Sequence, residues 1–294
     1  MDETQLAYEQ LIDQIISWAR EQENVRAAIV IGSRARKDHP ADRWSDLDVL
    51  ILANDPQRYL DDSEWVRGIG VPWLTFVEPT GDGSGFERRV LFEGGLDVDF
   101  APVSVAEVRA MAEQGFPPGV QDIIRRGVRI LIDKDGFARY LEPAGIESPV
   151  YQPPTDSRFL NLVHDFWYHA VWAAKHLRRR ELWWAKGGCD GHLKYLLQQM
   201  LEWHAHAVKG PEWDTWMRGR FLEQWADPRA VAALTDVYAH YDGEDIWRAL
   251  QATMDLFAWL APETAELLGY PYPATGEQQA TALVKALYME REQS

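Results

Sequence analysis

Two short stretches decide the fold of this chain: Gly32-Ser33-Arg34-Ala35-Arg36 and, a little further on, Ser45-Asp46-Leu47-Asp48-Val49-Leu50-Ile51-Leu52. The first follows an apolar run at residues 26–31, which is typical of a buried strand that ends at a glycine turn. The second passes from two aspartates into another apolar run, which predicts a second strand. Because side chains at i and i+2 of a strand share a face, Asp46 and Asp48 present their carboxylates in the same direction.

This pattern indicates a site for a metal-bound nucleotide. Mg²⁺ usually binds one or two carboxylates and completes its coordination with water and substrate phosphates. We expect Gly32 and Ser33 to open a short helix whose N–H groups, with the Ser33 hydroxyl, hold those phosphates. Arg34, Arg36 and Lys37 would add positive charge. Together these parts predict phosphoryl-type transfer.

A third carboxylate is expected from the later segment Leu96-Asp97-Val98-Asp99-Phe100, which follows the hairpin signal Gly94-Gly95. Alternation places Asp97 and Asp99 on one face of this strand. Such a carboxylate would deprotonate a hydroxyl or bind a second metal ion. We assign the catalytic role to Asp99, which lies further along the apolar strand. Asp97 is either an ordinary exposed hairpin acid or a contact to the substrate.

The hydrophobic pattern divides the chain into two domains. Residues 1–150 alternate between strand and helix patterns, whereas from 151 to 294 apolar residues recur every three or four positions, as in helices. The segment 142–156 holds four prolines and is the expected linker. The sequence therefore predicts an α+β domain with a mixed sheet, followed by an all-α domain.

Composition restricts the partners. The formal net charge of −16 disfavours nucleic acid and favours a cationic small molecule. No apolar run approaches the roughly 18 residues of a membrane-spanning helix, so no membrane partner is expected. The single cysteine, Cys189, excludes an internal disulfide and a cysteine-based zinc cage, as expected for the cytoplasm. We expect a monomer.

The order of glycine-serine turn, Asp-x-Asp strand and later acidic strand resembles the DNA polymerase β-like nucleotidyltransferase superfamily. Within it, the chain is similar to the aminoglycoside 6-adenylyltransferase (streptomycin adenylyltransferase) family, through Gly32-Ser33-Arg34-Ala35 and through segments of the second half. Those segments are Asp165-Phe166-Trp167, Ala174-Lys175, Arg180-Glu181-Leu182, Ala185-Lys186 and Leu197-Gln198-Gln199-Met200-Leu201-Glu202-Trp203-His204. The resemblance covers nearly the whole chain.

The resemblance implies transfer of AMP from ATP to a hydroxyl of a streptomycin-like aminoglycoside, with release of pyrophosphate. Mg²⁺ would be bound by Asp46, Asp48 and Asp99, and Asp99 would assist proton removal. Two differences put the acceptor and the modified position in question. Arg36 stands where the family commonly has asparagine, and Leu47 stands where it usually has an aromatic residue.

The resemblance also assigns roles in the helical half. Lys175 would lie near the nucleotide phosphates, and Glu181 and Asp190 would contact the cationic antibiotic. Both acids have a local alternative, because Asp190 can pair with Lys194 on a helix surface and Glu181 with the arginines before it.

Three other functions stay open. In the first, the enzyme transfers a nucleotide to another small molecule or to a protein hydroxyl. In the second, the chain is a non-catalytic nucleotide-binding regulatory protein. A zinc hydrolase would use His164, Asp165 and His169, which lie on one helical stretch, but the chain has no HExxH pattern.

Overall fold

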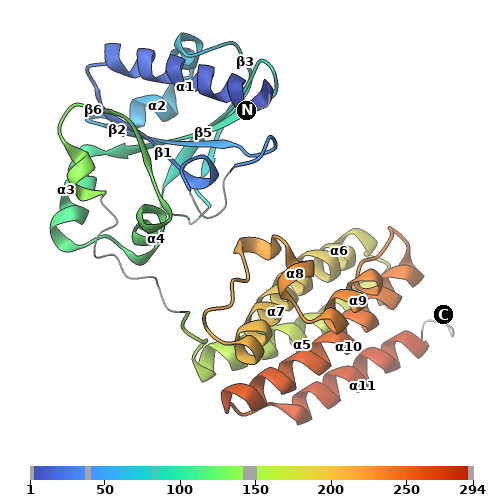
Figure 1. The fold of residues 1–294 in the computed structure, drawn as a ribbon. Helices are drawn as coiled ribbons and strands as arrows, with labels where there is room; N and C mark the ends of the chain where they lie inside the picture. Colours follow the sequence, from blue (N-terminus) through green and yellow to red (C-terminus); the bar gives the residue numbers. More distant parts are fainter. Residues whose placement is uncertain (1–2, 37–40, 82, 84, 142–150, 291–294) are drawn as a thin grey trace. The chain divides into compact units, whose positions relative to one another are not determined.

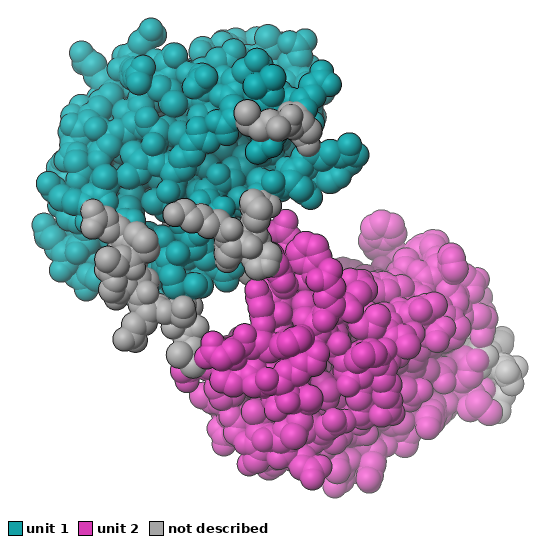
Figure 2. Space-filling view, viewed as in Figure 1, with its two compact units in different colours: residues 1–149 teal, residues 150–294 magenta. Residues whose placement is uncertain are grey.

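The computed structural model describes residues 3–36, 41–81, 83, 85–141 and 151–290. The chain forms two compact units, Met1–Pro149 and Val150–Ser294, which are coloured teal and magenta in Figure 2. Most of the predicted linker, residues 142–150, and Lys37 lie outside the described residues.

The first unit is built on a six-stranded sheet with the order β3-β4-β5-β2-β1-β6 (Figure 1). β2 and β5 are parallel, and the other neighbouring strands are antiparallel. The predicted mixed sheet is therefore confirmed. The strands are β1 (Val25–Ile31), β2 (Leu47–Ala53), β3 (Pro72–Pro79), β4 (Phe86–Phe92), β5 (Leu96–Ser104) and β6 (Arg129–Asp133).

Helices cover both faces of this sheet (Figure 1). Leu11 and Ile15 of α1 (Glu3–Glu21) join the core on the face that also receives Val30. Val108 of α3 (Val105–Gln114) packs on the opposite face with Ile29. Adjacent residues of β1 thus enter different cores, which explains why the central strands are apolar on both sides. The shorter elements are η1 (Gly32–Arg34), α2 (Gln57–Asp61), η2 (Glu64–Gly68), α4 (Pro118–Arg126) and η3 (Phe137–Tyr140).

The described residues of the second unit form helices joined by loops, with no strand among them, and the predicted all-α domain is confirmed. Its core is centred on Phe166 and Phe257, whose buried rings stack with centroids 3.6 Å apart. The Thr155 hydroxyl accepts a hydrogen bond from the backbone N–H of Arg158 and caps the long helix α5. The helices are α5 (Asp156–Arg178), α6 (Leu182–Gly187), the π-helical turn η4 (Gly188–His192), α7 (Leu193–Lys209), η5 (Met217–Gly219), α8 (Leu222–Trp225), α9 (Pro228–Val237), α10 (Gly243–Leu268) and α11 (Ala274–Glu290).

None of the helices described in the two units combines the length and the apolar character that a membrane span requires.

The Phe257 ring should contribute strongly to the stability of the helical unit. Replacing a fully buried phenylalanine by alanine removes its apolar contacts and leaves a cavity, so Phe257→Ala should lower the free energy of unfolding by about 3–5 kcal/mol. Urea unfolding followed by far-ultraviolet circular dichroism measures this. Leu267→Ala on the same helix is the control, because Leu267 is 50% exposed. Equal losses in the two variants would contradict the assigned core.

Candidate active site

Three carboxylates meet where β2 and β5 lie side by side. Asp48 on β2 stands opposite Asp99 on β5 in the parallel register. Asp46 immediately precedes β2, and the carboxylate oxygens of all three residues come within 4.8 Å of one another. The structure therefore brings together the three residues that the sequence predicts as the metal and catalytic carboxylates.

Gly32 closes one side of this cluster. It follows β1, whose last residue, Ile31, pairs with Asp48. The φ angle of Gly32 is +67°, and a Cβ atom there would lie only 2.1 Å from Oδ2 of Asp48. Both the backbone conformation and the close approach require glycine. The turn thus brings backbone directly against the Asp48 carboxylate.

The electrostatics of the cluster are unfavourable without a cation. Burial, followed by the charges of Asp46 and Asp99, raises the pKa of Asp48 to about 7. Burial also raises the pKa of Asp99 to about 7, although the neighbouring Arg89 acts in the opposite direction. Clustered carboxylates that resist ionisation are typical of a functional site, because a bound cation removes their mutual repulsion.

The turn after β1 is shorter than the predicted helix: η1 is a three-residue 3₁₀ turn. The Ser33 hydroxyl oxygen is buried there and has no hydrogen-bond partner among the described residues. A buried hydroxyl without a partner is costly, so this atom is available to a ligand. The side chain of Arg36 is half-buried, and its charge lowers the pKa of Asp48.

Arg34 supports the backbone of the site. Its guanidinium donates to the carbonyl oxygens of Asp46, at 2.9 Å, and Ser45, at 2.5 Å. The same group lies 3.4 Å from the centroid of the Tyr8 ring. These contacts fix the segment that leads into β2, whereas the sequence suggested a role on the nucleotide phosphates.

Asp97 lies outside the cluster. It is exposed, and its Oδ1 accepts a hydrogen bond from the Tyr8 hydroxyl at 2.8 Å. Burial and the hydrogen bond to Asp97 raise the pKa of Tyr8 to about 12. Asp97 therefore attaches β5 to α1 in the described structure.

Two site residues on β4 were missed by the sequence analysis. Arg89 stands opposite Asp99, and its Nη2 lies 3.1 Å from Asp99 Oδ2. Arg89 also pairs with Glu87 at 3.1 Å and with Glu78 at 2.6 Å. The Gly94-Gly95 hairpin signal implies that β4 and β5 pair, so that one face of β4 lies beside the acidic face of β5. Glu87 and Arg89 could have been predicted as site residues from that signal.

The remaining candidates lie in the helical unit. Lys175 is exposed on α5 and lines a cavity of about 380 Å³ with Trp167 and Trp172. Glu181 forms an ion pair with Arg179, at 2.7 Å, and a hydrogen bond with Nδ1 of His176. The local alternative for Glu181 thus occurs in the structure.

Asp190 also has local partners. It forms an ion pair with Lys186, and its Oδ1 lies 3.7 Å from the Nζ of Lys194. The expected surface pair of Asp190 and Lys194 is wrong in one respect, because Lys194 is buried and donates hydrogen bonds to the Cys189 carbonyl and the Thr253 hydroxyl. Helix packing over α7, which the local pattern did not reveal, excludes water from this lysine.

Comparisons with known proteins show what the chain is similar to. The chain is 23% identical to the aminoglycoside 6-adenylyltransferase of Bacillus subtilis, over 90% of this chain and 92% of that protein. It is 21% identical to the protein of the same name from Campylobacter jejuni, over 94% of each. A crystal structure of an aminoglycoside 6-adenyltransferase from Bacillus subtilis superposes with a TM-score of 0.44 and 19% identity, covering 95% of this chain and 98% of the other.

The chain is a nucleotidyltransferase, an enzyme of the class that these relatives represent. More specifically, it belongs to the streptomycin adenylyltransferase family, whose model matches residues 7–287. The resemblance noted from the sequence motifs is therefore confirmed.

The raised pKa of Asp48 makes a prediction about stability. Its pKa of about 7 in the folded protein exceeds the ordinary value of 3.8, so the folded state binds more protons between these values. Stability of the metal-free protein should consequently fall as pH rises from about 4 to 7. Asp48→Asn removes this loss and should be more stable than wild type at pH 8, by about 1 kcal/mol or more.

Urea unfolding in EDTA at pH 5 and pH 8 measures the effect. The control is Asp13→Asn, an exposed aspartate on α1, which should show no comparable gain at pH 8. A variant Asp48→Asn that is less stable than wild type at pH 8 would overturn the electrostatic account.

Proposed function

We propose that the chain transfers AMP from ATP to a hydroxyl group of an aminoglycoside, with Mg²⁺ as the cofactor and pyrophosphate as the second product. The observation that carries this proposal is the clustering of the Asp46, Asp48 and Asp99 carboxylates, with ligand oxygens within 4.8 Å of one another, beside the glycine turn at Gly32. Membership of the streptomycin adenylyltransferase family and the names of the relatives support the nucleotide and the acceptor.

The three carboxylates suit a divalent cation. Mg²⁺ prefers oxygen ligands, and burial, together with the charges of neighbouring acids, raises the pKa values of Asp48 and Asp99, a cost that a bound cation would offset. We assign Asp46, Asp48 and Asp99 as the residues that hold it. When bound, Mg²⁺ neutralises charge on the nucleotide phosphates and polarises the phosphoryl oxygens.

The chain's own groups complete the site. The unpartnered Ser33 hydroxyl and the backbone around Gly32 would bind phosphate oxygens. Asp99 would take the proton from the acceptor hydroxyl, whose oxygen bonds to the α-phosphorus as the bond to pyrophosphate breaks. Arg89 orients this carboxylate, because its Nη2 lies 3.1 Å from Asp99 Oδ2.

The acceptor is assigned from charge and relatives. A net charge of −16 favours a cationic molecule over a nucleic acid. As the resemblance implies, we propose that Lys175 of the helical unit binds the nucleotide phosphates and that Glu181 and Asp190 contact the cationic antibiotic. For Glu181 and Asp190 this requires release from the local ion pairs that they form. We further propose that the enzyme acts as a cytoplasmic monomer.

Asp48→Asn should abolish transfer while the fold is retained, because the substitution removes a charge without changing the size of the side chain. Pyrophosphate release from ATP is measured with Mg²⁺ and streptomycin, with other aminoglycosides and without acceptor, and product mass is recorded. The control Asp13→Asn should keep its activity.

An AMP adduct that requires both streptomycin and Mg²⁺ would support the full proposal. Hydrolysis or transfer that persists in Asp48→Asn would remove this residue from the mechanism. If ATP binds but no aminoglycoside is modified, the acceptor is another small molecule or a protein hydroxyl, or the chain only binds the nucleotide.

Ser33→Ala offers a separate test of the phosphate contact. Because the hydroxyl is buried without a partner, its removal should leave stability unchanged or slightly higher. The KM for ATP should rise by about ten-fold, which corresponds to the loss of one charge-assisted hydrogen bond. Steady-state kinetics and thermal unfolding decide this, and a destabilised variant with an unchanged KM would show that Ser33 is structural.

A further inference from the structure

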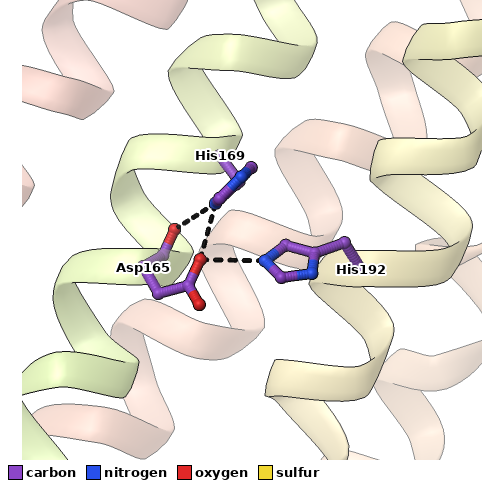
Figure 3. A group of neighbouring side chains, drawn as sticks. All are labelled: Asp165, His169 and His192. Atoms are coloured by element: carbon purple, nitrogen blue, oxygen red, sulfur yellow. Dashed lines mark hydrogen bonds and ion pairs between the residues drawn. The ribbon is translucent and has the colours of Figure 1, made fainter.

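A second group of metal-binding side chains lies in the helical unit (Figure 3). Asp165 and His169 project from α5, and His192 approaches from η4. Both imidazole rings point at the same carboxylate oxygen: Asp165 Oδ1 lies 2.6 Å from His169 Nδ1 and 2.8 Å from His192 Nε2. The cluster shares no residue with the carboxylate site of the first unit.

Local structure explains how the three side chains meet. Asp165 and His169 are four residues apart on a helix and therefore share a face. His192 ends a π-helical turn, a wide turn that often occurs at functional sites. Gly188 opens this turn, and a Cβ atom there would lie 2.5 Å from the Trp172 ring of α5. The glycine thus allows η4 to approach α5 closely enough for His192 to reach Asp165.

The three ligand atoms match a transition-metal site. They lie within 4.8 Å of one another, and the side chains are 30%, 33% and 39% exposed, so an ion can enter from solvent. Tetrahedral ligands at about 2.0–2.1 Å from Zn²⁺ stand roughly 3.3 Å apart. The separations from Asp165 Oδ1, 2.6 and 2.8 Å, therefore need to widen by about 0.5–0.7 Å, which small side-chain rotations supply.

We propose that Asp165, His169 and His192 bind one divalent transition-metal ion of the Zn²⁺ type, with a remaining position open to water or another ligand. Two imidazole nitrogens with one carboxylate favour Zn²⁺, Co²⁺, Ni²⁺ or Cu²⁺ over Mg²⁺. The hydrolase interpretation of the sequence used His164, which is exposed and is not part of this cluster. The structure replaces it with His192, which comes from a different helical segment.

Binding should change the tautomer of His169. Without metal, Nδ1 of His169 lies between two acceptor oxygens, Asp165 Oδ1 at 2.6 Å and the Asp165 carbonyl at 3.0 Å, so it carries hydrogen. Coordination through Nδ1 requires the other tautomer of the neutral imidazole, so the hydrogen moves to Nε2 and the net charge of the ring does not change.

The test is a Co²⁺ titration of the full chain after treatment with a chelator. The Asp48→Asn background is used so that binding at the carboxylate site is weakened. We expect one Co²⁺ per chain, with visible absorption bands, and displacement of Co²⁺ by Zn²⁺. His169→Asn and His192→Asn should each weaken Co²⁺ binding by at least about 10–100-fold. This is the loss of metal affinity that follows removal of a group that only orients a metal ligand, and a ligand itself should matter at least as much.

His164→Asn is the matched control on the same helix and should bind Co²⁺ as the parent does. Circular dichroism and thermal unfolding establish that each variant is folded. Equal Co²⁺ affinity of the parent and both cluster variants would overturn the site. The absence of one-to-one binding at a metal concentration of about 0.1 mM would overturn it as well. Neither measurement depends on nucleotidyl transfer, so the result stands whether or not the proposed activity is found.

Discussion

The parallel pairing of β2 with β5 is the constraint on which the first unit depends. Its register places Asp48 opposite Asp99 at the centre of a sheet that is covered on both faces. Burial of two acids side by side opposes folding, since their pKa values rise to about 7. The apolar contacts of the strands outweigh this cost, so the sheet can hold charges that would separate in a flexible loop.

Much of this arrangement follows from the period of a strand. Alternation alone places Asp46 with Asp48, and Asp97 with Asp99, on common faces. The choice between Asp97 and Asp99 depends on register, which the local sequence does not specify because β2 and β5 are separated by two other strands along the chain. The hydrogen bond from Tyr8 to Asp97 is likewise a contact between distant segments.

Long side chains and helix irregularities were harder to predict. The sequence cannot show whether an arginine points to a ligand or to its own backbone, and Arg34 does the latter. In the helical unit, periodicity predicted the helices. It did not predict that the packing of α10 against α7 buries Lys194, which donates a hydrogen bond to the Thr253 hydroxyl of α10. The cluster around Asp165 depends on a π-helical turn, which changes the direction in which the His192 side chain points. No clear sequence pattern predicts such a turn.

Tyr8 has a consequence for any altered form of the enzyme. Its ring lies under Arg34 and its hydroxyl holds Asp97, so the first helix braces both acidic strands at once. The first two turns of α1 therefore support the site even though they carry none of its carboxylates. An N-terminal fusion partner or truncation that unwinds this helix would remove the Tyr8 contacts that support the acidic strands. The resulting inactive protein would be mistaken for one that lacks the activity.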